Sequence, residues 1–315
     1  MAGRRCLTGS CSDVSRGGAA VSRRRTPPPV GPLQVDGEVF SVKRVGDYFH
    51  LTIVADGIAE RTRPGNFVAM SVGGEASATL LRRAFSIYRV KPAGIYGGTV
   101  EIIVAAHGPG TAWLATRQRH DPVNVVGPLG RPFALPKQPV PCALVGGGYG
   151  SAPLFGLATK LRERNCGVHM VLGASTEARL FGALEAKRAA SSVTVTTVDG
   201  SVGIRGIVTD PLPALLARHD IDVVYSCGPM GMLRAVSGVA TRHGAWSQTA
   251  VEEAMACGVG VCMTCVLPVV GDDNVTRMVR SCVEGPVFAG DKVRWDAIGT
   301  IPAGTHGAPV ESSQP

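Results

Sequence analysis

The amino-acid sequence predicts a multidomain α+β protein. We expect a small antiparallel β-barrel, then a doubly wound parallel α/β sheet, and last a C-terminal unit organised by cysteines. Three observations predict this order: short alternating apolar segments broken by Gly and Pro fill residues 34–136, strand and helix patterns alternate over 137–245, and four of the nine cysteines cluster within 246–300. Residues 1–33 and 301–315 carry neither pattern, and we expect disordered tails there.

Composition limits the possible functions. The chain has 315 residues and 45% hydrophobic content, which is enough for two or three domains with cores. The net charge is +8, but the first 30 residues hold six arginines and one acid, so the rest carries only +3. No basic face rich in aromatic residues stands out, so we expect no nucleic-acid binding. The apolar runs are strand-length, so we expect no membrane span either.

The basic N-terminal segment has arginines but no apolar run like that of a secretory signal. A disordered extension, a start codon assigned too early and an organelle transit peptide are the open alternatives. An odd number of cysteines in a large chain argues against a disulfide framework, and we expect a reducing cytoplasm.

In the barrel region, period-two alternation predicts strands, and one helix interrupts them. The expected strands are 38–42, 50–54, 66–70, 84–88 and 99–104, and the expected helix is 110–118. In the following region the expected strands are 142–145, 168–172, 192–198 and 222–226, and the helices are 152–164 and 231–243. The second alternation is typical of a parallel sheet covered on both faces.

The cysteine cluster is the most specific signal in the chain. It consists of Cys257, Cys262, Cys265 and Cys282. Four residues and then two separate the first three, which is the plant-type [2Fe–2S] spacing with a more distant fourth thiolate. Gly258 and Gly260 permit the tight turn that such a cluster needs. A structural zinc site is the alternative, although zinc sites usually pair two short Cys-x₂-Cys knuckles.

Two barrel segments have the chemistry of a flavin site. The first is Arg82-Arg83-Ala84-Phe85-Ser86, and the second includes Ala105, Ala106, His107, Gly110 and Thr111. An arginine fork pairs well with a pyrophosphate, and a strand that runs into a helix start binds anions. A solvated arginine pair and a structural histidine are the alternatives.

A glycine loop follows the first strand of the α/β region and includes Gly146, Gly148 and Gly150. Such loops let the backbone approach a pyrophosphate at a helix N-terminus. Ser151 stands where a third fingerprint glycine would be, so a plain turn is the alternative. Cys227, Gly228 and Pro229 end a later strand, at the edge where such sheets bind ligands. Cys227 is either close to a nicotinamide or a buried small residue. NADH and NADPH both stay open.

With these motifs in this order, the chain resembles ferredoxin–NADP reductase relatives, and among them the electron-transfer subunits of NAD-dependent dihydroorotate dehydrogenase. The matching stretches are 81–87, 198–203, 252–262 and 282–288. The resemblance implies that FAD is held by Arg83, Ala84, Phe85, Ser86, Ala105, Ala106, His107, Gly110 and Thr111. It also implies that the four clustered cysteines hold a [2Fe–2S] cluster. Ala84 and Phe85 depart from the proline and smaller aliphatic residue usual there.

The resemblance further implies a partner and a reaction. The partner would be an FMN-containing dihydroorotate dehydrogenase catalytic subunit, in a heterotetramer of two such pairs. Electrons would pass from its FMN through the cluster and FAD to NAD⁺, in de novo pyrimidine (UMP) biosynthesis. No residue of this chain is expected to perform acid–base catalysis, because the cofactors carry the chemistry. The alternatives are a ferredoxin–NADP reductase-like or sulfhydrogenase or sulfide dehydrogenase gamma subunit, and a zinc-bearing regulator.

Overall fold

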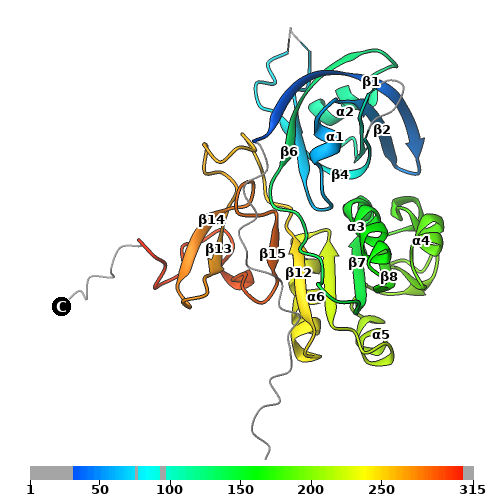
Figure 1. The fold of residues 1–315 in the computed structure, drawn as a ribbon, viewed down its shortest axis with the longest axis vertical. Coiled ribbons are helices and arrows are strands. Elements are labelled where there is room, and N and C mark those ends of the chain that lie inside the picture. Colours follow the sequence, from blue (N-terminus) through cyan, green and yellow to red (C-terminus); the bar gives the residue numbers. More distant parts are fainter. Residues whose placement is uncertain (1–30, 75–76, 93–96, 308–315) are drawn as a thin grey trace, which may run out of the picture.

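The computed structural model describes residues 31–74, 77–92 and 97–307. The expected disordered tails lie largely outside this part of the chain. Figure 1 shows three parts: a barrel at the top, a larger sheet with helices below it, and a small two-stranded unit to one side. The fold class predicted from the sequence is confirmed.

Six strands close the barrel in the order β1-β2-β5-β4-β3-β6, and neighbouring strands are antiparallel. They are β1 (Leu33–Val45), β2 (Tyr48–Val54), β3 (Phe67–Met70), β4 (Arg83–Lys91), β5 (Thr99–Val104) and β6 (Pro122–Leu129). Two short helices, α1 (Ile58–Arg61) and α2 (Pro109–Ala115), accompany them. The core is aliphatic, with Leu51, Ile53, Val68 and Ile102 fully buried. Strand β6 was not predicted, because Pro122 and Gly127-Pro128 resemble turn residues.

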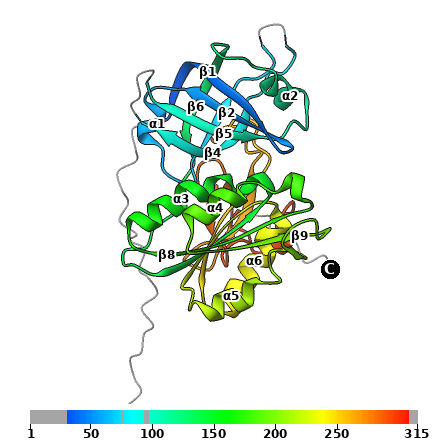
Figure 2. The same ribbon diagram turned by 90° about the vertical axis from the view of Figure 1, so that its right-hand side faces the viewer.

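The second sheet has the order β10-β9-β8-β7-β11-β12-β15. Its strands are β7 (Pro141–Gly147), β8 (Gly167–Ala174), β9 (Ser192–Thr197), β10 (Ile204–Arg205), β11 (Val223–Cys227), β12 (Trp246–Ala250) and β15 (Val287–Ala289). All neighbours are parallel except β12 and β15. Helices α3 (Ala152–Glu163) and α4 (Ala183–Ala189) cover the face toward the barrel, and α5 (Leu212–Arg218) and α6 (Met230–Arg242) cover the other face, as Figure 2 shows. Buried apolar runs such as Cys142–Val145 are expected of a sheet covered on both faces.

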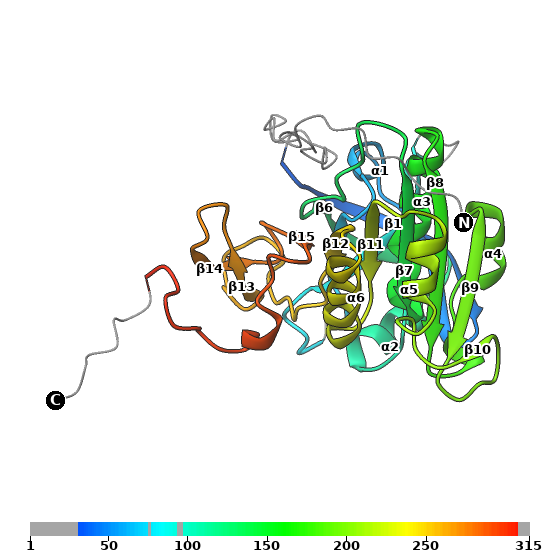
Figure 3. The ribbon, with the colours of Figure 1, turned by 90° about the horizontal axis from the view of Figure 1, so that it is seen from below.

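The cysteine-bearing segment is tied to this sheet. Strands β13 (Val266–Val270) and β14 (Thr276–Arg280) form a separate hairpin, while β15 pairs with β12 at the sheet edge. Figure 3 shows the hairpin beyond β15, on the side of α6. Short 3₁₀ turns are η1 (Gly148–Ser151), η2 (Glu177–Arg179) and η3 (Trp295–Ala297). The sheet continues past residue 245 into β12, so the exact domain limits stay a prediction.

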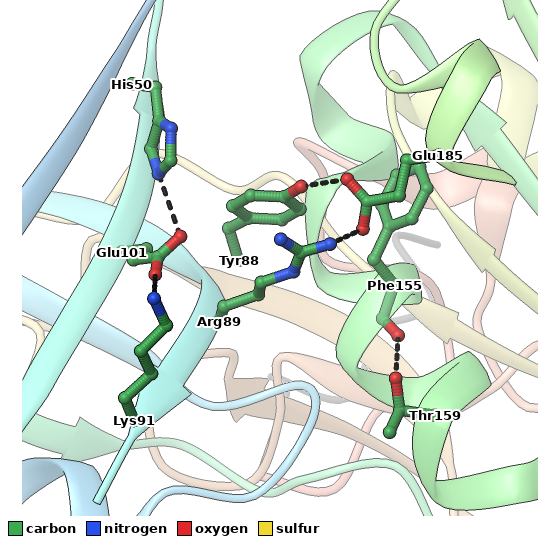
Figure 4. A network of polar contacts seen from close by, with 8 residues as sticks. All are labelled: His50, Tyr88, Arg89, Lys91, Glu101, Phe155, Thr159 and Glu185. Atoms are coloured by element: carbon green, nitrogen blue, oxygen red, sulfur yellow. Dashed lines mark hydrogen bonds and ion pairs between the residues drawn. The ribbon is translucent and has the colours of Figure 1, made fainter. Parts of the chain in front are cut away.

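An aromatic and polar contact joins the barrel to the helices of the sheet (Figure 4). On β4, the Tyr88 hydroxyl donates a hydrogen bond to Glu185 of α4, and Arg89 forms an ion pair with the same carboxylate. The Tyr88 ring packs edge-on against Phe155 of α3, with ring centroids 5.8 Å apart. Burial and the contact with Glu185 raise the pKa of Tyr88, so it stays a donor. These contacts set the barrel's position over the carboxyl ends of the parallel strands.

A second polar group lies beside Tyr88 on the barrel. Nε2 of His50 is 2.9 Å from Oε2 of Glu101, and Nζ of Lys91 is 3.8 Å from its Oε1. The Glu101 side chain is only 5% exposed. Burial raises its pKa, but the hydrogen bond and charge of His50 and the charge of Lys91 outweigh burial and lower it. Glu101 is therefore a paired carboxylate of the barrel.

Candidate cofactor sites

Two cavities meet where the barrel faces the sheet. The larger, of about 500 Å³, opens at the carboxyl ends of the parallel strands and is called the nucleotide cavity below. It is lined by residues that include Gly147, Gly148, Tyr149, Ser175, Arg179, Thr196, Val208, Pro229, Met232 and Glu252. The second, of about 420 Å³, lies against β4 and is called the flavin cavity. Its lining includes Ala84, Phe85, Ser86, Ile103, Tyr149, Gly150, Glu252, Glu253, Met255 and Pro286.

The glycine loop and the end of β11 come together in the nucleotide cavity. A Cβ placed on Gly147 would lie 2.9 Å from Cδ of Pro229, and one on Gly150 would lie 2.8 Å from Cα of Gly228. Glycine is therefore required by close backbone approach, as a pyrophosphate loop also needs. The buried Thr196 hydroxyl lines this cavity and has no partner among the described residues. The cavity thus offers the close backbone approach and the free polar group that a dinucleotide can use.

Cys227 does not line the nucleotide cavity, although Pro229, two residues later, does. Its side chain is 2% exposed, and burial and then the charge of Glu252 raise the pKa of its thiol. The thiol is thus a neutral group behind the cavity wall. Arg179 also lines the cavity, and its Nε is 3.8 Å from Oδ2 of Asp47. A phosphate would therefore share this guanidinium with the Asp47 carboxylate.

The flavin cavity takes alternate residues of β4. Ala84 and Ser86 are exposed residues of its lining, whereas Phe85, which also lines it, is 9% exposed and packs into the barrel core. The two arginines before them have separate roles. Arg82 donates to the backbone carbonyl of Asn124 at 3.2 Å and to its side chain, which ties it to β6. Among the described residues, Arg83 donates hydrogen bonds only to carbonyl groups of its own loop, which leaves its guanidinium available for an anion.

The start of α2 lies beside Arg83. A Cβ on Gly110 would be 3.7 Å from Cγ of Arg83. The Thr111 hydroxyl accepts hydrogen bonds from the backbone N–H groups of His107 and Gly108, both at 3.1 Å. An arginine beside a helix start is an arrangement suited to a pyrophosphate. Ala105, Ala106, His107, Gly110 and Thr111 do not line the flavin cavity itself, so their contact with FAD stays a prediction.

The cysteine loop is shaped around sulfur. The Sγ of Cys257 accepts from the backbone N–H groups of Val259, Val261 and Cys262, at 3.4, 3.3 and 3.5 Å. Gly258 and Gly260 have φ of 72° and 84°, and Met263 has φ of 59°. Successive N–H groups aimed at one sulfur stabilise its negative charge. The loop therefore fits an anionic iron–sulfur cluster.

The four thiols form two pairs. Cys262 lies beside Cys257, and Cys282 lies beside Cys265. Among the described residues, no three or more His, Cys, Asp or Glu side chains are placed to hold one metal ion. A two-iron cluster takes two ligands at each iron, so paired thiols fit it. Hydrogen bonds from Thr264 and then Cys257 lower the pKa of Cys262 to about 6, which favours the thiolate that binds iron.

Comparison with known proteins agrees with this chemistry. A family model described as the iron–sulfur cluster binding domain of dihydroorotate dehydrogenase B matches residues 252–294. The electron transfer subunit of dihydroorotate dehydrogenase B (NAD⁺) from Geobacillus thermodenitrificans is 39% identical over 248 residues, which cover 78% of this chain and 92% of the relative. The subunit with the same name from Desulforamulus reducens is 33% identical, over 83% of this chain and 98% of the relative. This chain belongs to that family.

Solved structures of ferredoxin–NADP oxidoreductases share the fold of this family member. The NADH-dependent reduced ferredoxin–NADP oxidoreductase, studied for flavin-based electron bifurcation, is similar with a TM-score of 0.72 and 28% identity, over 84% of this chain and 91% of that one. A ferredoxin–NADP⁺ reductase from Neisseria gonorrhoeae shares the fold, with a TM-score of 0.55 and 16% identity, over 68% of this chain and 92% of that one. No helix in the described part of this family member is long and apolar enough to cross a membrane.

Sequence reasoning missed two residues of the site in this family member. Tyr149 and Glu252 line both cavities. Tyr149 lies inside the glycine loop and Glu252 begins the 252–262 stretch, but neither was named as a site residue. An aromatic residue between two loop glycines and an acid next to a cysteine motif were the available signals. Their common position depends on segments far apart in the sequence.

Proposed function

We propose that this chain is the electron-transfer subunit of a dihydroorotate dehydrogenase. It would accept electrons from the FMN of a catalytic partner and pass them through a [2Fe–2S] cluster and FAD to NAD⁺, within de novo pyrimidine (UMP) biosynthesis. One observation carries the proposal: the chain has a cysteine loop with paired thiols, a flavin cavity and a nucleotide cavity. The two cavities are adjacent, because Tyr149 and Glu252 line both. The identity of 33–39% to subunits with this name favours it over a ferredoxin–NADP reductase subunit.

The residues would divide the work by chemistry. A flavin takes up two electrons as hydride and can release them singly, which matches a one-electron cluster on one side and NAD⁺ on the other. Arg83 and the start of α2 would bind the FAD pyrophosphate, while Ala84 and Ser86 would face its ring. The loop of Gly146, Gly148 and Gly150 would carry the dinucleotide phosphates, with Gly228 and Pro229 as its second wall. Cys257, Cys262, Cys265 and Cys282 would hold the cluster.

The partner would dock over the cysteine loop. Val259, Val261 and Met263 are exposed by 44%, 79% and 52%, although they are apolar. Exposed apolar side chains gathered at one site are typical of a protein interface. A docked subunit would bring its FMN toward the cluster and exclude water from it. We further propose a heterotetramer of two such pairs in a reducing cytoplasm, where the thiols would stay free of disulfides.

Val261→Lys tests the docking surface. We expect this variant to slow electron transfer from the catalytic partner, because a charge must then be buried in the interface. NADH oxidation by a small artificial acceptor should be unchanged, because that reaction needs no docking. Equal loss of both activities would contradict the docking surface. Lys160→Ala, on the exposed side of α3, is the matched surface control.

An absorbance spectrum of the anaerobically purified chain, before and after NADH, tests the cofactors. Flavin bands with a broad visible shoulder, both bleached by NADH, are the expected result. A colourless protein with bound zinc would overturn the proposed function.

A further inference from the structure

One guanidinium group joins the hairpin to the cysteine loop. Arg280 is the last residue of β14 and precedes Cys282 by two residues. Its Nη1 donates a hydrogen bond of 3.1 Å to the backbone carbonyl of Gly260. A Cβ on Gly260 would lie 3.4 Å from the same nitrogen, so the guanidinium lies directly against the backbone of the loop. The contact connects two segments that are 20 residues apart in the sequence.

The same side chain forms a forked ion pair with Glu284. Nη2 of Arg280 is 2.7 Å from Oε1 of Glu284, and Nε is 3.3 Å from Oε2. The backbone N–H of Arg280 also donates to Oε2, at 2.9 Å. Two N–H groups that bind one carboxylate hold the plane of the guanidinium in one orientation. Glu284 therefore keeps the arginine where it meets the loop.

This arginine places a permanent positive charge beside two of the four cysteines. Its pKa is raised first by the hydrogen bond and charge of Glu284, and then by the charges of Cys282 and Cys265. An arginine remains protonated throughout the pH range in which proteins are folded. Both of these cysteines are 2% exposed, whereas the Arg280 side chain is 35% exposed. The charge therefore lies at the surface, next to the buried half of the cysteine site.

We propose that Arg280 raises the midpoint potential of the [2Fe–2S] cluster and that Glu284 partly offsets this effect. The inference rests on the proposed function, in which the four clustered cysteines hold the cluster. The cluster gains one electron from the partner's FMN and passes it to the flavin, so its negative charge grows by one on reduction. A nearby positive charge stabilises the reduced form, and a nearby negative charge destabilises it.

The two charges do not cancel, because they differ in their contact with the loop. Among the described residues, the Glu284 carboxylate accepts hydrogen bonds only from Arg280. The guanidinium lies between this carboxylate and the loop, which it contacts at Gly260. The backbone of Gly260 in turn lies beside the Cys282 thiol. The positive charge is thus the nearer of the two to the cluster ligands.

Arg280→Gln and Glu284→Gln should shift the potential in opposite directions. A redox titration of the anaerobically purified, FAD-loaded chain, followed by visible absorbance and EPR, measures the cluster potential. Arg280→Gln leaves an unpaired carboxylate, so the equilibrium constant for one-electron reduction should fall about 3- to 10-fold, which is about 30–60 mV. Glu284→Gln should raise the potential. Both shifts should shrink in about 1 M salt, where the Debye length is about 3 Å.

Arg277→Gln is the matched control. Arg277 lies on the same strand and forms an ion pair of the same length, 2.7 Å, with Asp273. Among the described residues it donates only to Asp273 and Val275, so its removal should leave the cluster potential unchanged. Arg280→Lys keeps the charge but loses the planar fork. It should keep a potential near the wild-type value and lose iron faster to a chelator.

The signs of the shifts decide the inference. Unchanged potentials in Arg280→Gln and Glu284→Gln, or shifts in the same direction, would overturn it, as would an Arg280→Lys potential as low as that of Arg280→Gln. If Arg280→Gln binds no cluster, the direction of the Glu284→Gln shift is decisive. The wild-type spectrum is recorded first: a chain without a [2Fe–2S] cluster refutes the proposed function, whereas a normal cluster with unchanged variants refutes only the role of Arg280.

Discussion

Gly150 in η1 and Gly156 in α3 belong to the same loop-and-helix segment, yet alanine should have opposite effects on stability at the two positions. At Gly150 a Cβ would lie 2.8 Å from Cα of Gly228 and 2.7 Å from Oε1 of Glu252. At Gly156, inside α3, the nearest atom would be the Tyr88 carbonyl oxygen at 3.5 Å, an ordinary contact. A methyl group therefore has no room at Gly150, where backbone atoms are too close, but it fits at Gly156.

The magnitudes follow from these contacts. Gly150→Ala forces a backbone shift, and such overpacking lowers the free energy of unfolding by about 1–3 kcal/mol. Gly156→Ala restricts the unfolded chain without strain and should raise that free energy by about 0.4–1 kcal/mol. At roughly 2–4 °C per kcal/mol, the melting temperature should fall by about 2–12 °C in the first variant and rise by about 1–4 °C in the second.

Thermal unfolding of the FAD-loaded chain measures both shifts, and a titration with NAD⁺ measures the effect on the site. Gly150→Ala should also weaken NAD⁺ binding, because the loop is pushed away from Gly228 and the cavity wall changes. Gly156→Ala should bind NAD⁺ as the wild type does. A melting temperature of Gly150→Ala at or above the wild-type value would refute the argument from close backbone approach.

Three further outcomes are expected. Cys282→Ser should lose the visible absorbance of the cluster while the flavin bands remain, as anaerobic spectra would show. Tyr88→Phe should lower the free energy of unfolding by about 1.5–3 kcal/mol in denaturant titrations, because its hydroxyl bonds the charged Glu185. The pKa of Glu101 is lower in the folded protein than in the unfolded chain. Its contribution to the free energy of unfolding is therefore full above about pH 4.3 and is lost as pH falls through the folded pKa. His50→Ala should reduce this loss of stability in acid, as unfolding experiments at several pH values would show.

Local patterns in the sequence were sufficient for much of this protein. Cysteine spacing alone predicts an iron–sulfur loop, since the turn around the cluster is built from neighbouring residues such as Gly258 and Gly260. Alternation of period two and the strand–helix alternation predict the barrel and the parallel sheet, because these periods reflect which face of each element is buried. The order of the motifs predicts the family.

Contacts between distant segments needed the tertiary structure. Strand β6 is difficult to predict from the sequence because it contains prolines, yet it closes the barrel by pairing with both β1 and β3. Strand β15, from beyond the cysteine loop, completes the sheet of the preceding region by pairing with β12. The adjacent Arg82 and Arg83 diverge because only Arg82 reaches Asn124. No local period records such pairings.

The sequence by itself therefore determined which cofactor chemistry this chain can support, because spacing and residue type decide what a loop can bind. Only the tertiary structure decided how the two cavities meet. Tyr149 and Glu252 come from segments far apart in the chain, and they line both cavities because the barrel is held over the carboxyl ends of the sheet. That arrangement depends on how the barrel packs against the sheet and its helices. The sequence of one segment describes only one side of this interface.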